Sequence, residues 1–422
     1  MLRTLTLFTI AILNVTLLFF SAEAYLSLAT PITLPTIASI PSQTAILVSS
    51  QGTPSPTKTP LPLNTPTPSP SPTTPMESTP TSIENVISGI NPLTGEFVSD
   101  PSILEHRPIA IKVCNYPRSV RPQSGLSFAD HVYEYYLERG ITRFIAIFYG
   151  QEAEKVGPVR SARLFDEHIF RMYESIFVFG NADDRIIDYF LTLGSEIIHR
   201  FILEHTAEKK IVCRPGTLSR LCRDRSIASY NNLFANTAAI SQDVSERGID
   251  NQAPDLSGLR FDQAPPTGGD PATSISIDYS EFIYARWLYH QESGRYIRFQ
   301  DNQDASSASE RSYVPLIDHL TNQVISADNV IVLFVPHSFH TKTRTTEIVQ
   351  IELTGMGPAY LFRDGRVYPV YWVRPTQGIL YFINSNGEKA ILRPGITFFQ
   401  VIGESSTIEQ GEEAWQFVFG IP

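Results

Sequence analysis

The fold of this chain depends first on the run Ile109-Ala110-Ile111-Lys112-Val113-Cys114 and on a second apolar run at residues 141–149. Both runs are short and rich in β-branched or aromatic residues, which is typical of buried strands. Residues 130–138 fit a strand by alternation or a helix by acidic spacing, and their Tyr and Val content favours a strand. Helices are expected at 164–174, with Ser161 as a cap, and at 186–193, with a strand at 176–179 between them.

The chain beyond residue 272 is predicted to be β-rich, and Ser293-Gly294, Asp364-Gly365 and Asn386-Gly387 favour the positive φ of tight hairpins. The expected strands are 274–279, 283–289, 296–299, 329–335, 347–353, 359–362, 367–373, 379–383 and 398–402. Pro and Gly gather just before them. We therefore predict an α+β chain: a mixed α/β N-terminal domain with layered sheets and helices at 85–253, a linker at 254–272, and a β-rich C-terminal domain at 273–422.

The N-terminus carries an export signal. Arg3 precedes an apolar run at residues 5–20, and Ser21-Ala22-Glu23-Ala24 follows it as a cleavage pattern. Residues 1–24 are predicted to be a signal peptide, with an uncleaved N-terminal anchor as the alternative. Residues 25–84 hold a Pro/Ser/Thr tract that is expected to be a disordered stalk. The folded part is therefore expected to be extracytoplasmic, secreted or held at the cell membrane by the N-terminal segment.

The 422 residues carry 33 Lys and Arg against 43 Asp and Glu, a net charge of −10. This acidic balance argues against a nucleic-acid partner, because such binding rests on excess Lys and Arg. Of the three cysteines, Cys213 and Cys222 could close a loop as a disulfide, while Cys114 lies in an apolar run and is expected to be a buried small residue.

A series of motifs between residues 91 and 163 resembles the YerB-like family, a two-part domain of unknown function found in bacterial lipoproteins. The motifs are Asn91-Pro92-Leu93-Thr94-Gly95, Arg107-Pro108-Ile109-Ala110, Arg121-Pro122-Gln123-Ser124-Gly125-Leu126, Ala129-Asp130, Val132-Tyr133-Glu134, Gly140-Ile141-Thr142-Arg143-Phe144 and Gly157-Pro158-Val159-Arg160-Ser161-Ala162-Arg163. Tyr296, Arg298, Trp372 and residues 392–397 resemble the second part of the family. The resemblance implies an α/β domain before a β-rich domain, and it assigns no biochemical function to the chain.

The chain departs from the family at three places. No cysteine stands after the apolar run to accept the lipid, so the lipobox is missing. Gly180-Asn181-Ala182-Asp183-Asp184 stands where the family has a Gly-rich segment, and Tyr230-Asn231 stands where His-Asn is common. These differences leave the mode of anchoring open.

The strongest chemical signal is a set of arginines, because the guanidinium fork binds carboxylate or phosphate in a bidentate manner. The candidate ligand-binding residues are Arg121, Arg143, Arg160, Arg163, Gln123, Asn115, Ser161, Asp130 and Glu134. The leading hypothesis is a non-catalytic envelope protein that binds an anionic ligand, such as a wall polymer, a lipid head group or an acidic peptide, in an arginine-lined pocket. In the alternative interpretation, the arginines form internal ion pairs with Asp130, Glu134 and Glu138.

Two other functions are open. Asp130, Glu134 or Glu138 could serve as the acid or base of a hydrolase that cleaves polysaccharide or phosphoester bonds, although no known catalytic motif occurs. A protein–protein module could instead offer a sheet edge to a protein partner. No cofactor and no metal are expected. The pair His337 and His340 lacks an evident third ligand, and Asp183-Asp184 and Asp166-Glu167-His168 are interpreted as solvated charges at helix ends.

Overall fold

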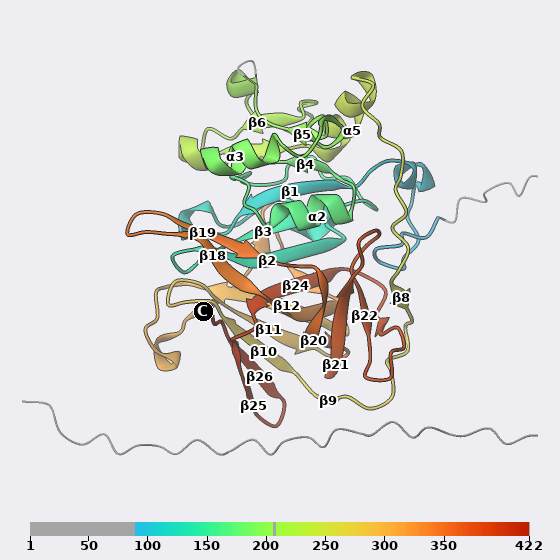
Figure 1. Ribbon diagram of the computed structural model, residues 1–422, viewed down its shortest axis with the longest axis vertical. Coiled ribbons are helices and arrows are strands. Elements are labelled where there is room, and N and C mark those ends of the chain that lie inside the picture. The colour runs from blue at the N-terminus through green and yellow to red at the C-terminus, as the bar shows by residue number, and fades with distance from the viewer. Residues whose placement is uncertain (1–88, 206–207, 422) are drawn as a thin grey trace, which may run out of the picture. The chain divides into compact units, whose positions relative to one another are not determined.

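The computed structural model describes residues 89–205 and 208–421, which belong to one compact unit (Figure 1). The predicted signal peptide or anchor at 1–24 and the predicted stalk at 25–84 lie outside the described residues. Within the described residues, no helix has both the length and the apolar character that a membrane span requires.

The N-terminal segment contains the predicted alternation of strands and helices. Its principal elements are β1 (Ile109–Cys114), β2 (His131–Glu138), β3 (Ile141–Phe148), α2 (Asp166–Met172), β4 (Ile176–Val178), α3 (Asp184–Phe190), α4 (Ser195–Ile198), β5 (Phe201–Ile202), β6 (Leu221–Arg223), β7 (Leu233–Ala235) and α5 (Thr237–Glu246). Helix α5 was not predicted, because its sequence is mostly polar or small. Its formation depends on an Asn236 side-chain cap to the Ala239 amide at 3.0 Å and on the burial of Ile240 and Val244.

The C-terminal segment is almost entirely strands, and all nine predicted strands are present within a few residues of their expected ends. They are β10 (Ser274–Asp278), β11 (Tyr284–His290), β12 (Arg295–Asp301), β17 (Asn329–Val335), β19 (Glu347–Ile351), β20 (Gly355–Arg363), β21 (Arg366–Arg374), β22 (Tyr381–Ile383) and β24 (Thr397–Gly403). The β20–β21 turn has φ of 51° at Asp364 and 69° at Gly365, as its Asp-Gly pair predicts. Further strands used below are β13 (Tyr313–Pro315), β16 (Ser326–Ala327), β18 (His337–Lys342), β25 (Thr407–Gln410) and β26 (Ala414–Val418).

One large sheet runs through both segments. Its strand order is β22-β21-β20-β17-β24-β2-β3-β1-β4-β5, and β2 of the first segment pairs in parallel with β24 of the second. The residues predicted as a linker, 254–272, include β8 (Arg260–Phe261) and β9 (Asp270–Pro271), which pair with β23 (Ile391–Leu392) and β21. The chain is therefore predominantly β, and its two parts share a central sheet that the sequence pattern did not indicate.

A second sheet, ordered β13-β12-β11-β10-β26-β25, covers one face of the central sheet. Trp287 of β11 packs on Phe398 of β24 with ring centroids 4.9 Å apart, and both side chains are buried. Helix α2 covers the opposite face of β1, β2 and β3, where Phe165 packs on Tyr135 at 4.6 Å (Figure 1). The strands around β2 are thus buried on both sides, which explains their continuous apolar character.

Candidate functional site

The nine predicted site residues lie in more than one place. Arg143 is directly opposite Tyr135 in the β2–β3 ladder, whereas Glu134 is opposite Phe144. Because successive residues of a strand point to opposite faces, Arg143 and Glu134 lie on different sides of the central sheet. Arg143, Arg160, Arg163 and Ser161 gather on the α2 side, while Asn115 and Glu134 belong to a network that extends to the second sheet.

We call Arg143, Arg160 and Arg163 the arginine cluster. Arg143 is buried, with 5% of its surface exposed, and its Nη1 donates to the Ser161 carbonyl at 2.8 Å. Arg160 donates to the Tyr230 carbonyl, and its buried Nε has no hydrogen-bond partner within the described residues. Arg163 donates to Glu138 at 2.7 Å. Of the three guanidinium groups, only that of Arg163 has a carboxylate partner in the part of the chain that the structure describes.

The electrostatics of Arg143 follow from this arrangement. Burial, together with the nearby charges of Arg163 and Arg160, lowers the pKa of the Arg143 guanidinium to about 10. The side chain stays protonated at neutral pH despite this shift. Burial also raises the pKa of the Cys114 thiol, against the opposing effect of Arg143 and Arg160. The cluster therefore carries more positive than negative charge, and an anionic group bound there would compensate the excess.

A buried polar trio lies next to the cluster. Lys112 of β1 donates to Asp166 of α2 at 3.0 Å, and Tyr135 of β2 contacts both residues. Burial lowers the pKa of Lys112 to about 7, and the Asp166 carboxylate opposes this shift. The interpretation of Asp166 as a solvated helix-end charge is therefore wrong, because the side chain is fully buried and compensates a lysine. The same interpretation of Asp183 is correct, since it caps α3 through the Arg185 amide at 3.1 Å.

The expected cap at Ser161 is also wrong. Helix α2 begins five residues later at Asp166, whose Oδ2 accepts a hydrogen bond from the Arg163 amide at 2.7 Å. The Ser161 carbonyl instead holds Arg143. Arg160 and Arg163 consequently precede the helix in an extended segment, and their position is set by backbone bonds from Arg160 to Lys112 of β1 at 3.0 Å and from Gly180 to Arg160 at 3.0 Å.

On the other face of the sheet, the polar network is internally neutralised. The Glu134 carboxylate accepts from Asn115 at 3.0 Å, Thr142 at 2.8 Å and Arg298 at 2.6 Å. Arg298 comes from β12 in the second sheet and lies over the Trp287 ring at 5.0 Å. Both members of the Glu134–Arg298 pair are fully buried, which makes the pair a bridge between the two segments.

Arg121 and Gln123 extend this network. Arg121 donates to both oxygens of Asp301, at 2.8 and 3.0 Å, and to the Asn115 carbonyl at 3.0 Å. Gln123 donates to the Cys114 carbonyl at 3.1 Å and to Asn115 at 3.2 Å. For Arg121, the interpretation as an internal ion pair is therefore correct, although the partner is Asp301 of the C-terminal segment and not Asp130, Glu134 or Glu138.

Asp130 has a separate role. Its carboxylate accepts from the Asn91 side chain at 2.7 Å and from the Tyr149 and Gly150 amides at 2.6 and 3.0 Å. Burial raises the pKa of Asp130 to about 6, while these hydrogen bonds lower it. The residue thus fixes the N-terminal turn at residues 91–95 to the end of β3, and no arginine contacts it among the described residues.

Cys213 and Cys222 form a disulfide, and Cys114 is buried with a free thiol that donates to the Tyr116 carbonyl at 3.1 Å. His337 is buried with Nδ1 2.7 Å from the Val335 carbonyl, whereas His340 lines a surface cavity. Among the residues that the structure describes, no group of three or more His, Cys, Asp or Glu side chains is arranged to hold a metal ion.

Three buried charged residues, Lys112, Arg298 and Asp301, were not predicted from the sequence to form these networks. Lys112 carried a usable signal, because a charge inside an otherwise apolar strand needs a buried partner. Arg298 and Asp301 carried none, since their partners Glu134 and Arg121 lie 164 and 180 residues away in the chain.

The fold and the site define a strand-rich protein of two segments joined by one sheet, with an arginine cluster beside it. Residues 93–250 match the family model "Protein of unknown function (DUF3048) N-terminal domain", and residues 275–399 match its C-terminal domain. The chain belongs to this two-part family, which confirms the predicted YerB-like resemblance.

Two individual comparisons agree with the family. "Putative lipoprotein YerB" of Bacillus subtilis (strain 168) is 51% identical over 87 residues, which span 21% of this chain and 26% of the relative's length. The crystal structure of YerB protein from Bacillus subtilis superposes with a TM-score of 0.60 at 24% identity, covering 74% of this chain and 96% of the other. This likeness shows a common fold.

Proposed function

We propose that this protein is an extracytoplasmic, non-catalytic binding protein of the bacterial envelope that recognises an anionic ligand through the arginine cluster. The location is supported by the export pattern at residues 1–24 and by the name of the lipoprotein relative. The expected ligand presents a phosphate or carboxylate, because either group matches the donor fork of arginine.

The observation that carries the proposal is the uncompensated charge of Arg143. A buried guanidinium ordinarily has a carboxylate partner, since the desolvation of an isolated charge is costly. Arg143 donates to a backbone carbonyl and lies near two further arginines, of which only Arg163 is paired in the described residues. An anion placed between Arg143 and Arg160 would supply the missing negative charge.

The state of the carboxylates favours binding over hydrolysis. A hydrolytic acid or base must reach its substrate and hold a suitable protonation state. Glu134 is buried against Arg298, Glu138 is paired with Arg163, and Asp130 is buried among hydrogen-bond donors. None of the three stands free in a cleft, so the hydrolase alternative has no support from their geometry.

Titration calorimetry tests this function. The purified protein is titrated with a glycerol phosphate oligomer, a glutamate oligomer and an uncharged glucose oligomer of similar length. We expect one of the charged oligomers to bind and the glucose oligomer not to bind. Arg143→Gln should raise Kd at least tenfold, since a charge-assisted hydrogen bond contributes about 1.5–3 kcal/mol.

The matched control is Arg225→Gln, which makes the same charge change at an exposed residue outside the cluster. It should leave Kd within twofold of the native value. Equal losses in the two variants would mean that binding depends on overall charge, and an undiminished affinity in Arg143→Gln would remove the cluster as the site.

A further inference from the structure

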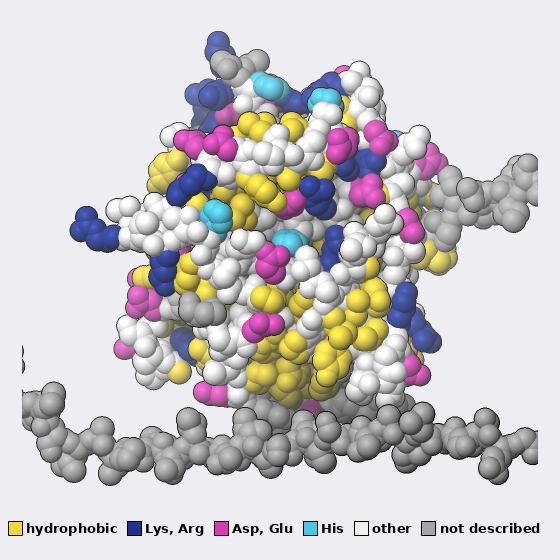
Figure 2. Space-filling view, viewed as in Figure 1, with side chains coloured by type: hydrophobic (Ala, Val, Ile, Leu, Met, Phe, Trp, Pro, Cys, Tyr) yellow, Lys and Arg dark blue, Asp and Glu magenta, His cyan; other side chains and the backbone are white. Residues whose placement is uncertain are grey.

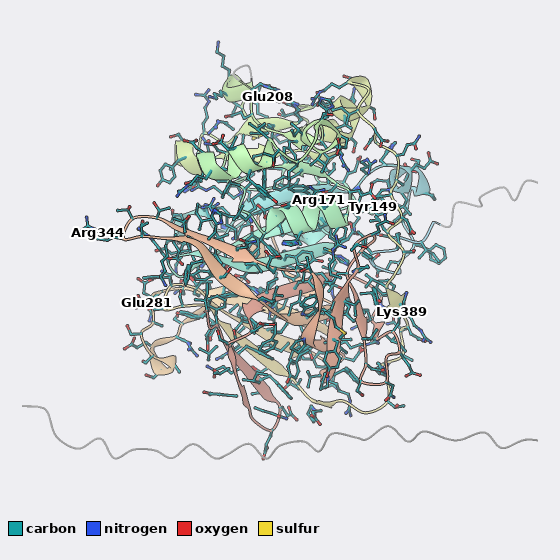
Figure 3. The ribbon with its side chains drawn as sticks, viewed as in Figure 1. Tyr149, Arg171, Glu208, Glu281, Arg344 and Lys389 are labelled. Carbon is teal, nitrogen blue, oxygen red and sulfur yellow. A yellow bond between two sulfur atoms is a disulfide. The ribbon has the colours of Figure 1, made fainter. Side chains whose placement is uncertain are left out.

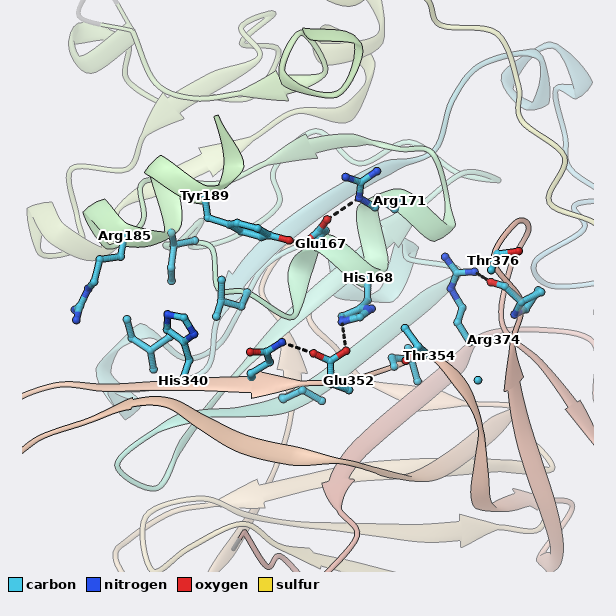
Figure 4. A pocket seen from close by; sticks show the side chains of 18 residues that line it. Glu167, His168, Arg171, Arg185, Tyr189, His340, Glu352, Thr354, Arg374 and Thr376 are labelled. Carbon is cyan, nitrogen blue, oxygen red and sulfur yellow. Dashed lines mark hydrogen bonds and ion pairs between the residues drawn. The ribbon is translucent and has the colours of Figure 1, made fainter. Parts of the chain in front are cut away.

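A cavity of about 710 Å³ lies between the N-terminal helices and the C-terminal strands, and no residue of the arginine cluster lines it. Figure 4 shows this cavity with α2 and α3 on one side and the β18–β19 hairpin on the other. We call it the helix–hairpin cavity. Its volume falls in the range of pockets that bind small organic molecules. The cavity is therefore a candidate ligand site separate from the arginine cluster.

Most charged side chains that line the helix–hairpin cavity are paired within the protein. Arg171 donates to Glu167 at 2.7 Å, and Glu167 also accepts from the Tyr189 hydroxyl at 2.7 Å. Arg185 donates to Asp183 at 2.8 Å. Because these pairs cancel charge, the charge that a ligand must match is set by the side chains that remain.

One carboxylate of the cavity, that of Glu352, has no lysine or arginine partner among the described residues. It accepts a hydrogen bond from the Gln350 side chain and lies 3.8 Å from the His168 ring (Figure 4). Burial lowers the pKa of His168, so the ring is largely neutral at pH 7 and does not cancel the carboxylate charge. The Glu352 side chain is 41% exposed and lines the cavity. It can therefore accept hydrogen bonds from a cationic group of a ligand.

One guanidinium of the cavity, that of Arg374, forms no ion pair in the part of the chain that the structure describes. One of its nitrogens donates to the neighbouring Pro375 carbonyl, and its buried Nε has no partner there. In Figure 4, His168 lies between Glu352 and Arg374, and the charges of these two residues act on the pKa of His168 in opposite directions. The cavity thus presents one negative and one positive group on either side of a neutral histidine.

Apolar side chains form much of the remaining wall. Leu164, Ile186 and Ile348 line the cavity, and Tyr189 is 42% exposed beside them. Figure 2 shows basic, acidic and histidine side chains interspersed with apolar ones over this face, without a field of one sign. A ligand with one group of each sign, no net charge and some apolar surface matches this lining.

We infer that the helix–hairpin cavity binds a short peptide with free ends, whose terminal ammonium contacts Glu352, whose terminal carboxylate contacts Arg374 and whose apolar side chain packs on the apolar wall. A polyanion would satisfy Arg374 but would be repelled by Glu352, and a neutral sugar would leave both charges unmatched. A single amino acid carries both charges on one carbon atom, whereas the His168 ring separates the two partners. The inference does not depend on the function proposed for the arginine cluster, because the two sites share no residue.

Titration calorimetry with the tripeptide alanyl-leucyl-alanine tests the inference on the full chain. We expect the unmodified peptide to bind, and N-acetylation or C-amidation each to raise Kd about fivefold, because each modification removes one terminal charge. A peptide that does not bind, or that binds equally well with both ends blocked, would overturn the inference. Free leucine that binds as tightly as the peptide would overturn the choice of a peptide.

Variants of the protein assign each end of the peptide to its partner. Glu352→Gln should weaken the unmodified peptide about fivefold and leave the N-acetylated peptide unaffected, because that peptide has no ammonium to lose. Arg374→Gln should have the same relation to the amidated peptide. Additive effects of a blocked end and its partner variant would overturn that contact.

The matched controls are Glu404→Gln and Arg366→Gln, which make the same charge changes at exposed residues outside the cavity. Each should change Kd less than about twofold. Lys389, labelled in Figure 3, lines only the adjoining cavity of about 890 Å³, so a loss of binding in Lys389→Gln would overturn the placement of the peptide. Arg143→Gln should leave peptide binding unchanged, and a loss there would overturn the independence of the two sites.

Discussion

Arg298 and Arg143 are both buried arginines near the middle of the central sheet, on its opposite faces. Arg298 is 1% exposed, bonds to Glu134 at 2.6 Å and lies over the Trp287 ring. Arg143 is 5% exposed, bonds to a backbone carbonyl and has two arginines for neighbours. The same residue type is thus compensated on one face and uncompensated on the other.

The difference between these two arginines separates a stabilising role from a candidate binding role. A buried charge with a buried partner stabilises the junction of two segments, because breaking the pair leaves an isolated charge. A buried charge without a partner costs free energy in the unliganded protein, and a ligand that supplies the partner recovers it. Burial alone therefore does not single out a candidate binding arginine, whereas burial without a carboxylate partner does.

The largest expected effect concerns the Glu134–Arg298 pair. Glu134→Gln should lower the free energy of unfolding by about 3–5 kcal/mol, because Arg298 would remain buried without its counter-charge. Chemical denaturation at neutral pH measures this loss. Glu138→Gln provides the control, since it breaks the partly exposed pair with Arg163 and should cost at most about 1 kcal/mol. Similar losses in both variants would remove the distinction between the two kinds of pair.

The next prediction tests whether a buried titratable side chain on the Arg143 face of the sheet, His131, is uncharged in the folded protein. Burial lowers the pKa of His131 from 6.5 to about 4, so the folded protein favours the neutral ring. The resulting stability is complete above pH 6.5 and is lost as the pH falls towards 4, by about 3 kcal/mol.

Denaturation at pH 7 and pH 4.5 should show this loss in the native protein and a much smaller one in His131→Gln. The exposed His290 supplies the control variant, His290→Gln, which should retain the native pH dependence. A native slope in His131→Gln would show that other groups dominate acid unfolding.

The smallest effect concerns Arg143 itself. Arg143→Met should leave the free energy of unfolding within about 1 kcal/mol of the native value or raise it, because a hydrophobic side chain replaces an uncompensated buried charge. Inorganic phosphate at ten times its Kd should stabilise the native protein by about 1.4 kcal/mol and leave the variant unchanged. Thermal unfolding with and without phosphate measures both quantities, and equal protection of the two proteins would place the anion elsewhere.

Much of the fold was predictable because local patterns express it. The strands at residues 109–114 and 329–335 are apolar without interruption, and the Asp364-Gly365 turn follows from the positive φ that those residues tolerate. Helix α5 was missed because its stability comes from the Asn236 cap and from the burial of Ile240 and Val244, and not from a strong apolar pattern in its own sequence.

The site was only partly predictable. Arg143, Arg160 and Arg163 were recognised as a set, and the structure brings them together. Arg121 was placed in the same set by its residue type, but its Asp301 partner comes from a strand that local sequence cannot align with it. The cavity lined by residues of α2, α3 and β19 was not foreseen at all, because its walls come from helices and strands far apart in the chain.

The sequence by itself determined the export pattern, the two-part family, the nature of most strands and the supply of arginines. Those properties reside in short runs of residues, whose physical preferences are local. Only the tertiary structure decided that both segments share one sheet and which arginine receives a carboxylate. The Glu134–Arg298 and Arg121–Asp301 pairs join residues more than a hundred positions apart. Alternation along β2 and β3 sends Glu134 towards Arg298 and Arg143 away from it.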